Sequence, residues 1–279
     1  MRELDVRAIG EAVGRLIRDT ATKLPDFVRQ DILRAIDSEP SPKGRELLRA
    51  LIRNADLALQ NRLPLCQDSG LPQALLELGT GIRLTGGSLK EAMIEYARTA
   101  WAESFLRQSG ADPLTRENLG RDIPLNLEFS PTEGSIARVF TLAKGGGCDN
   151  KGALFNLPPS TSPKAVKAAI VEKLLLAGPD SCPPWYVGVC VGGSFESAPR
   201  HARRALWDLA FGLGQSERER ELSDELLSLV NATGMGPMAL GGRCSALGLR
   251  ARIVPTHIAS LPVAINLCCH SFRPGMALI

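Results

Sequence analysis

The sequence predicts an α+β fold in which a helical N-terminal half packs with a mixed-sheet C-terminal half. Over residues 5–60, apolar residues recur three or four positions apart, which is typical of amphipathic helices. After Pro124, apolar residues instead alternate or cluster in short runs, which is typical of strands. Helices and strands do not alternate regularly, and no low-complexity linker interrupts the chain. We therefore expect one structural unit over residues 1–279.

The expected elements follow from this patterning in chain order. Three helices precede residue 60, separated by prolines at positions 25, 40 and 42, and a fourth covers 89–106. Apolar runs at 125–129 and 137–143 flank a polar turn, so we expect them to pair as a hairpin. Further helices are expected at 164–176, 198–212 and 217–230, and further strands at 185–191, 247–254 and 262–268.

Composition excludes several classes of protein. The net charge is only +3 and no long basic run occurs, so charge gives no reason to expect binding to nucleic acid or to a membrane surface. No apolar run approaches the roughly 20 residues that cross a bilayer, and the charged N-terminus does not resemble a signal peptide. We expect a cytoplasmic protein. In that compartment its seven cysteines are expected to include metal or catalytic ligands rather than to form a disulfide framework.

Three cysteine-bearing segments lie among Gly, Pro and polar residues. They are Cys66 in Leu-Cys-Gln-Asp-Ser-Gly, Cys182 before two prolines, and the pair Cys268 and Cys269. A cysteine that only fills a core usually lies in an apolar run, as Cys190 does between two valines. Thiols in polar turns instead suggest an iron–sulfur site, although the absence of a CxxC pair leaves the spacing itself a weak signal.

The segment Lys-Gly-Gly-Gly-Cys-Asp-Asn-Lys at 144–151 is a candidate anion-binding loop. Its glycines allow close approach of the backbone to a ligand, and Lys144 and Lys151 add positive charge for a carboxylate or phosphate. The alternative is a flexible surface loop. A second glycine-rich stretch at 188–193 lacks the third glycine of a dinucleotide fingerprint, so nucleotide binding is not favoured.

Several motifs together resemble one family. CQDSG, KGGGCDNK, CPP before VGVCVGG, NATGMGPMALGG, and a closing H-x-A-x-L-P-V-A with C-C-x-x-x-R occur in order from about residue 40 to 273. The chain in this respect resembles the α subunit of class I iron–sulfur fumarate hydratases and tartrate dehydratases. The resemblance implies a hydro-lyase that carries a [4Fe–4S] cluster on three cysteines, which leaves one iron open to a small dicarboxylate substrate.

The resemblance also implies the cluster ligands. The family's third ligand lies four residues before an arginine and twelve after a histidine, and here Arg273 and His257 stand at those distances from the second cysteine of the pair. The implied ligands are Cys66, Cys182 and Cys269.

Substrate-facing residues follow in the same way. Asp68 and His257 match family residues that face the substrate, although a lone histidine before a strand can also be structural. Arg107 matches an arginine that holds a substrate carboxylate. We expect three residues of the glycine-rich segment to bind substrate as well: Lys144, Gly147 and Asn150.

One departure from the family pattern and one missing part affect the expectations. Cys148 stands where Ser or Thr is usual, so an extra thiol is expected near the site. Single-chain relatives continue into a second domain that supplies further cationic residues, so we expect a separate β subunit in an α₂β₂ assembly. The expected reaction is hydration of fumarate to malate. The alternatives are dehydration of L(+)-tartrate and, in another class, a non-catalytic scaffold that binds zinc or a structural cluster.

Overall fold

A computed structural model describes residues 1–279, and the chain forms two compact units. Unit 1 comprises Met1–Pro25, Asn54–Gly146 and Arg273–Ile279, and unit 2 comprises Asp26–Arg53 and Gly147–Phe272. The segments of the two units alternate along the chain, so no single linker separates them. Patterning did not reveal this division. Both units combine helices with mixed sheets, which confirms the α+β class.

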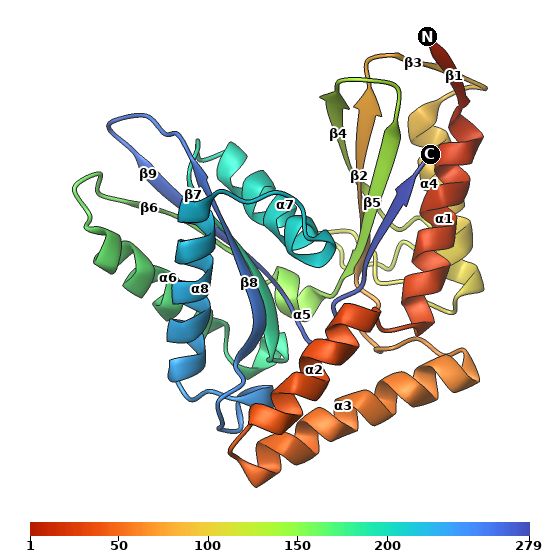
Figure 1. Ribbon diagram of the computed structural model, residues 1–279. Coiled ribbons are helices and arrows are strands. Elements are labelled where there is room, and N and C mark those ends of the chain that lie inside the picture. Colours follow the sequence, from red (N-terminus) through yellow and green to blue (C-terminus); the bar gives the residue numbers. More distant parts are fainter. The chain divides into compact units, whose positions relative to one another are not determined.

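Unit 1 contains two complete helices, the end of a third at residues 54–61, and two sheets. Helices α1 (Val6–Thr22) and α4 (Leu89–Glu103) pack against each other and against one face of the main sheet (Figure 1). That sheet has the strand order β10-β5-β2-β4. Its strands are β2 (Leu71–Gly79), β4 (Asn126–Thr132), β5 (Ala137–Lys144) and β10 (Pro274–Leu278). A second, two-stranded parallel sheet joins β1 (Arg2–Asp5) to β3 (Ile82–Thr85).

The expected hairpin between residues 125–129 and 137–143 is wrong. Both strands exist as β4 and β5, but β2 lies between them, parallel to β4 and antiparallel to β5. The central position of β2 hides Leu75 and Leu76 from solvent, and this burial stabilises a strand that the pattern did not predict.

Unit 2 is a four-stranded sheet with helices on both faces. The strand order is β6-β9-β7-β8, with β6 at Ala153–Leu157, β7 at Trp185–Gly192, β8 at Ala246–Val254 and β9 at Leu261–Cys268. Helices α6 (Pro163–Ala177) and α8 (Glu217–Ala232) contribute to the core on one face, and α7 (Ser197–Phe211) packs on the other (Figure 1). Short helices α5 (Gly146–Asp149), η1 (Pro179–Ser181) and η2 (Pro237–Ala239) lie in the connections.

The two remaining helices, α2 (Asp26–Ser38) and α3 (Pro42–Asn61), follow α1 in the chain. They confirm the helical reading of the first sixty residues, with breaks where the prolines stand. The expected helices and strands of unit 2 are confirmed to within one or two residues. No helix in the chain combines the length and the apolarity that crossing a lipid bilayer would require.

The glycine-rich strand β7 owes one glycine to helix packing rather than to ligand binding. A Cβ atom at Gly188 would lie 2.0 Å from the carbonyl oxygen of Ala202 in α7, so no other residue fits there. Cys190, two positions on, is fully buried beneath the same helix, as expected for a core residue. Gly188 is therefore explained by the close approach of α7 to the sheet.

Candidate functional site

One end of the main sheet of unit 1 brings together two of the predicted site segments and the residue that precedes β10. Strand β5 runs antiparallel to both β2 and β10, so its last residue, Lys144, pairs with Leu71 at the start of β2. The start of β10, at Pro274, lies along the same strand opposite Leu142. The segment before β2, the glycines after β5 and the residue before β10 consequently meet at one edge.

Two close approaches fix the conformation of the Cys66–Gly70 segment. Gly70 has φ +74°, and a Cβ atom there would lie 2.0 Å from the carbonyl oxygen of Lys144. Its amide donates a hydrogen bond of 3.1 Å to Oδ1 of Asp68. A Cβ atom at Gly145 would lie 2.7 Å from Oδ2 of the same carboxylate. Only glycines allow the Asp68 carboxyl group to lie this close to the end of β5.

Arg107 is held beside this segment by its backbone. Its amide donates to the hydroxyl oxygen of buried Ser69 at 2.9 Å, and its carbonyl accepts from the Trp101 indole at 3.0 Å. The Arg107 guanidinium group itself is left exposed. A fixed backbone with an exposed cationic head is suited to binding a carboxylate. Unit 1 thus brings together four predicted site residues: Cys66, Asp68, Arg107 and Lys144.

Arg273 is a further residue at this edge. In the sequence it served only to choose between Cys268 and Cys269 by its distance from them. Its side chain is 2% exposed, and Nη2 donates a 3.0 Å hydrogen bond to the carbonyl oxygen of Asp68. Its Nε and Nη1 atoms are buried without a hydrogen-bond partner. The sequence around Arg273 could not predict this hydrogen bond, because its partner, Asp68, is 205 positions away.

In unit 2, the two other cysteine segments lie at one end of the sheet. Tyr186 of β7 pairs with Cys268 at the end of β9, so the residues that flank both strands are neighbours. The Tyr186 and Phe272 rings stack with centroids 4.8 Å apart, and Phe27 packs edge-on against both. This aromatic cluster holds the segments that contain Cys182 and Cys269.

The glycine-rich segment continues into unit 2 beside Cys182. The Cys148 thiol donates to the Ser181 carbonyl at 3.2 Å, and a Cβ atom at Gly147 would lie 2.8 Å from the Asp180 carbonyl oxygen. Lys151 forms an ion pair of 3.3 Å with Asp180. The extra thiol at position 148 is thus in contact with Ser181, the residue that precedes the predicted ligand Cys182. Asn150, by contrast, is exposed, and no hydrogen bond holds its side chain.

Residues 234–244, here named the GMG loop, form a second support for Cys182. The Met238 amide donates to the Pro183 carbonyl at 2.8 Å, and Met238 and Ala239 both have positive φ angles, which are uncommon for residues other than glycine. Buried Glu39 anchors the far end of the loop, as its carboxylate accepts hydrogen bonds of 2.8–3.0 Å from the amides of Arg243 and Cys244. Nothing in the sequence around Glu39 indicated this role.

Exposure divides the seven cysteines into two groups. The three predicted ligands are partly exposed (Cys66, Cys182 and Cys269), and the other four are buried (Cys148, Cys190, Cys244 and Cys268). Burial raises the pKa of the Cys190 and Cys244 thiols to about 12, so both stay protonated near neutral pH.

Metal binding requires thiolates, so the donor chemistry of the three partly exposed cysteines fits an iron–sulfur cluster better than that of the buried ones. Neither unit by itself gathers three His, Cys, Asp or Glu side chains in an arrangement that could hold a metal ion. Cys66 belongs to unit 1, whereas Cys182 and Cys269 belong to unit 2.

His257 does not lie with the cysteines of its unit. It occupies the exposed turn between β8 and β9, where its Nδ1 accepts a 3.1 Å hydrogen bond from the Ala259 amide. Strand β9 then runs eight residues, about 25 Å, before it reaches Cys268. Within unit 2, His257 is therefore at the opposite end of the sheet from Cys182 and Cys269.

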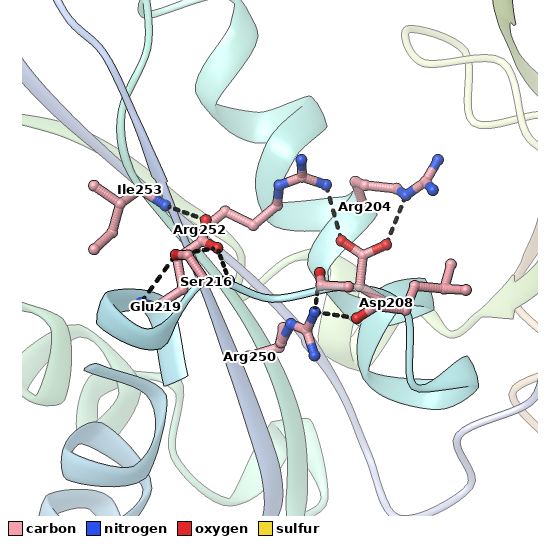
Figure 2. A network of polar contacts seen from close by, with 9 residues as sticks. Arg204, Asp208, Ser216, Glu219, Arg250, Arg252 and Ile253 are labelled. Atoms are coloured by element: carbon pink, nitrogen blue, oxygen red, sulfur yellow. Dashed lines mark hydrogen bonds and ion pairs between the residues drawn. The ribbon is translucent and has the colours of Figure 1, made fainter. Parts of the chain in front are cut away.

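A separate polar network ties α7 to β8 in unit 2. The buried Asp208 carboxylate accepts hydrogen bonds of 2.8 Å from Arg204 and from Arg252, and Arg250 donates to the Leu213 and Gly214 carbonyls (Figure 2). Both oxygens of Asp208 have cationic donors, as a stable buried carboxylate requires. The network is consequently a structural connection rather than a vacant binding site.

Comparison with known proteins agrees with this assembly of motifs. The fumarate hydratase (Fumerase) family model matches residues 10–277. A Methanocaldococcus jannaschii protein named L(+)-tartrate dehydratase subunit alpha, whose name marks the assignment as provisional, is 33% identical across 97% of each chain.

Two Escherichia coli proteins are also similar. The L(+)-tartrate dehydratase subunit alpha of strain O157:H7 is 25% identical over 98% of this chain and 91% of its own length. The aerobic class I fumarate hydratase of strain K12 is 31% identical over 87% of this chain, which spans 46% of that longer protein. The chain therefore belongs to the fumarate hydratase family of hydro-lyases.

Proposed function

We propose that this chain is the α subunit of an iron–sulfur hydro-lyase that interconverts fumarate and malate together with a β subunit. The observation that carries the proposal is the edge of unit 1, where Cys66, Asp68, Arg107 and Lys144 surround the close contact of Gly70 with the end of β5. This edge thus combines a thiol suited to a cluster, a carboxylate suited to proton transfer, and an exposed arginine and a buried lysine suited to one end of a dicarboxylate.

The proposed ligands of a [4Fe–4S] cluster are Cys66, Cys182 and Cys269, and their partial exposure and polar surroundings support this assignment. When bound, a cluster with one iron free of protein ligands supplies a Lewis acid for the hydroxyl group that leaves or adds. Three protein thiolates, rather than four, leave that position open.

The chain's own residues would bind the substrate and move a proton. Arg107 would bind one carboxylate through its planar guanidinium group, and its fixed backbone limits the entropy lost on binding. Lys144 and the amide of Gly147 would add positive potential, and Asn150 would reach the substrate from the same segment. Asp68, held at a defined position by the Gly70 amide, is placed to accept or orient a proton.

Charge supports a partnership with a β subunit. A substrate with two carboxylates needs cationic partners at both ends, and Arg107 is the exposed arginine that this site supplies. The relatives from M. jannaschii and E. coli O157:H7 that match nearly full length are both named as α subunits. We propose a two-fold symmetric α₂β₂ assembly, because paired chains of this kind favour closed symmetry.

Dehydration of L(+)-tartrate is the second candidate. It is favoured by the near-complete overlap, 97% of each chain, with the M. jannaschii protein named for that activity. Tartrate carries one more hydroxyl group than malate, so a polar group that receives it would discriminate between the two substrates.

The test is to purify the chain anaerobically with its co-expressed partner and assay malate, fumarate and tartrate. We expect about four irons and matching sulfide per chain, with turnover of one of these substrates. Stoichiometric zinc without turnover would instead support a scaffold. Full activity of the isolated chain would remove the need for a β subunit.

A further inference from the structure

Arg273 carries a buried charge that no ion pair neutralises. Its side chain is 2% exposed, and no ion pair involves it. One of its three nitrogen atoms, Nη2, donates to the Asp68 carbonyl, and Nε and Nη1 have no partner. An arginine stays protonated at every pH that proteins experience, and an unpaired buried charge is costly. The cost indicates that a negative group belongs near this side chain in the working protein.

The position of Arg273 limits what that group can be. Along the chain it follows Cys269 by four residues, and through its hydrogen bond it touches Asp68, two residues after Cys66. Lys144, a second buried cation, ends β5 at the same edge. The negative charge that reaches this place in the proposed function comes from thiolates and sulfide of a bound cluster or from a substrate carboxylate.

The burial of the orphan atoms favours the cluster. Nε and Nη1 are both inaccessible to solvent, so a diffusing carboxylate cannot reach them directly in this conformation. A charge held on fixed ligands needs no direct contact, because the Coulomb interaction acts over several ångströms in a protein interior. Arg273 would then act on a bound cluster in two ways: by fixing the position of the Cys66 segment, and by the positive charge of its own side chain.

We propose that Arg273 is a positioning residue that fixes the Cys66–Gly70 segment through the Asp68 carbonyl and balances the negative charge of a cluster bound at Cys66. This inference rests on the proposed function and deepens it. Residues that hold a ligand from behind typically change metal affinity by about 10- to 100-fold when altered. Arg273 would therefore influence cluster retention and cluster potential without touching the substrate.

The test compares Arg273→Gln, which removes the charge, with Arg273→Lys, which keeps it. Arg250→Gln is the matched control, because Arg250 is also buried and also donates to backbone carbonyls, but on β8 of unit 2. After anaerobic reconstitution, iron loss to a chelator and the midpoint potential of the cluster are measured. We expect Arg273→Gln to lose iron about tenfold faster. Its potential should move to more negative values, because an added electron is stabilised less.

Arg273→Lys should recover the potential and only part of the retention, since a single ammonium group replaces the planar fork. Arg250→Gln should leave both unchanged. Unchanged retention and potential in Arg273→Gln would overturn the inference, as would equal losses in the Gln and Lys variants. If Arg273→Gln does not fold, the test depends on Arg273→Lys. The inference is overturned if that variant keeps wild-type iron retention, or if its cluster potential differs from that of the wild type.

A third measurement separates the substrate carboxylate from the cluster. The metal-free wild type and variants are heated with and without succinate. One result would refute the cluster role: succinate stabilises every protein except Arg273→Gln, while that variant keeps the iron retention and the cluster potential of the wild type. It would assign Arg273 to the substrate carboxylate instead. Wild-type protein that binds iron but turns over no substrate refutes the proposed function alone. Wild-type protein that takes up no iron refutes both.

Discussion

Substitution of Glu39 by Gln tests whether a buried carboxylate anchors the GMG loop. Glu39 is 1% exposed and accepts hydrogen bonds from the amides of Ser41, Arg243 and Cys244. Gln has nearly the same shape, but it accepts through one oxygen only and places an NH₂ group against a backbone donor. The substitution therefore removes charge and hydrogen bonds while it leaves the packing intact.

The expected cost follows from these contacts. Hydrogen bonds to a charged group contribute about 1.5–3 kcal/mol each, and a buried amide left without an acceptor costs about 1–3 kcal/mol. Loss of one charge-assisted bond and one orphaned amide gives about 3–5 kcal/mol in the free energy of unfolding. At about 2–4 °C per kcal/mol for a chain of this size, the unfolding midpoint should fall by about 10 °C.

The pH dependence gives a second, independent readout. Burial alone would raise the pKa of Glu39, but hydrogen bonds from the amides of Cys244, Arg243 and Ser41 outweigh it, and the pKa is lowered from its usual value of 4.5. A carboxyl group whose pKa is lowered on folding stabilises the protein above the unfolded-state pKa, and this contribution is lost as the pH falls through the folded-state pKa. The difference between wild type and Glu39→Gln should be full at pH 7 and should shrink below about pH 4.5.

Thermal and urea unfolding of the reduced, metal-free protein at pH 7 and pH 4 would measure both effects. Glu217→Gln is the control, because this exposed glutamate on α8 pairs only with Arg220 on the helix surface. It should change the unfolding free energy by less than about 0.5 kcal/mol. The reasoning is refuted if Glu39→Gln is as stable as the control, or if its deficit is the same at both pH values.

Three further predictions concern the site itself. Substitution of each proposed ligand should abolish the visible absorption of the cluster, as in Cys66→Ser, Cys182→Ser and Cys269→Ser. Substitution of a buried thiol should leave that absorption unchanged, as in Cys190→Ser and Cys244→Ser. Arg107→Ala should raise KM for the dicarboxylate about tenfold or more while iron content stays normal, and an unchanged KM would remove it from the substrate site. His257→Asn should keep the cluster and lose turnover about 10²-fold. His257 and Cys182 lie at opposite ends of the sheet, so His257 would have to act at the cluster of another copy of the chain. Assemblies that mix His257→Asn chains with Cys182→Ser chains should then regain activity. No recovery would contradict that reading.

Local patterning predicted the helices well because their signals are local. The buried positions Val6, Ile9, Val13 and Ile17 of α1 are the ones whose spacing predicted the helix, and the Ser216 side chain begins α8 with a capping box. Strand β2 was missed for the opposite reason. Its leucines, alanine and glutamate favour helix in isolation, and only its central place between β4 and β5 makes it a strand. The same non-local pairing made the expected hairpin wrong.

The candidate site divides along a similar line. Residues that would carry chemistry were found because thiols, carboxylates and glycines in polar segments are unusual enough to notice, as at Cys66 and Asp68. The structure adds that the predicted ligands are the partly exposed cysteines, and that Cys268 is buried at the end of β9 whereas Cys269 follows the strand. Alternation alone could not decide which of this adjacent pair is accessible, because it does not show where the strand ends.

The residues that hold these segments had no comparable signal, and the physical reason is general to such sites. A group that must meet a substrate or a metal stays partly exposed, so its position has to be fixed by other atoms. Here those atoms belong to buried polar side chains: Ser69 fixes Arg107, Arg273 fixes Asp68, and Glu39 fixes the loop beneath Pro183. Each anchor acts through a partner 38 or more positions away, so neither periodicity nor a short motif can reveal it. Each is also nearly inaccessible, so its loss would disturb the site without removing any group that touches the substrate. Defects at Arg273 or Glu39 should consequently appear first in cluster retention and stability, whereas a defect at Ser69 should also weaken substrate binding, because Ser69 holds Arg107.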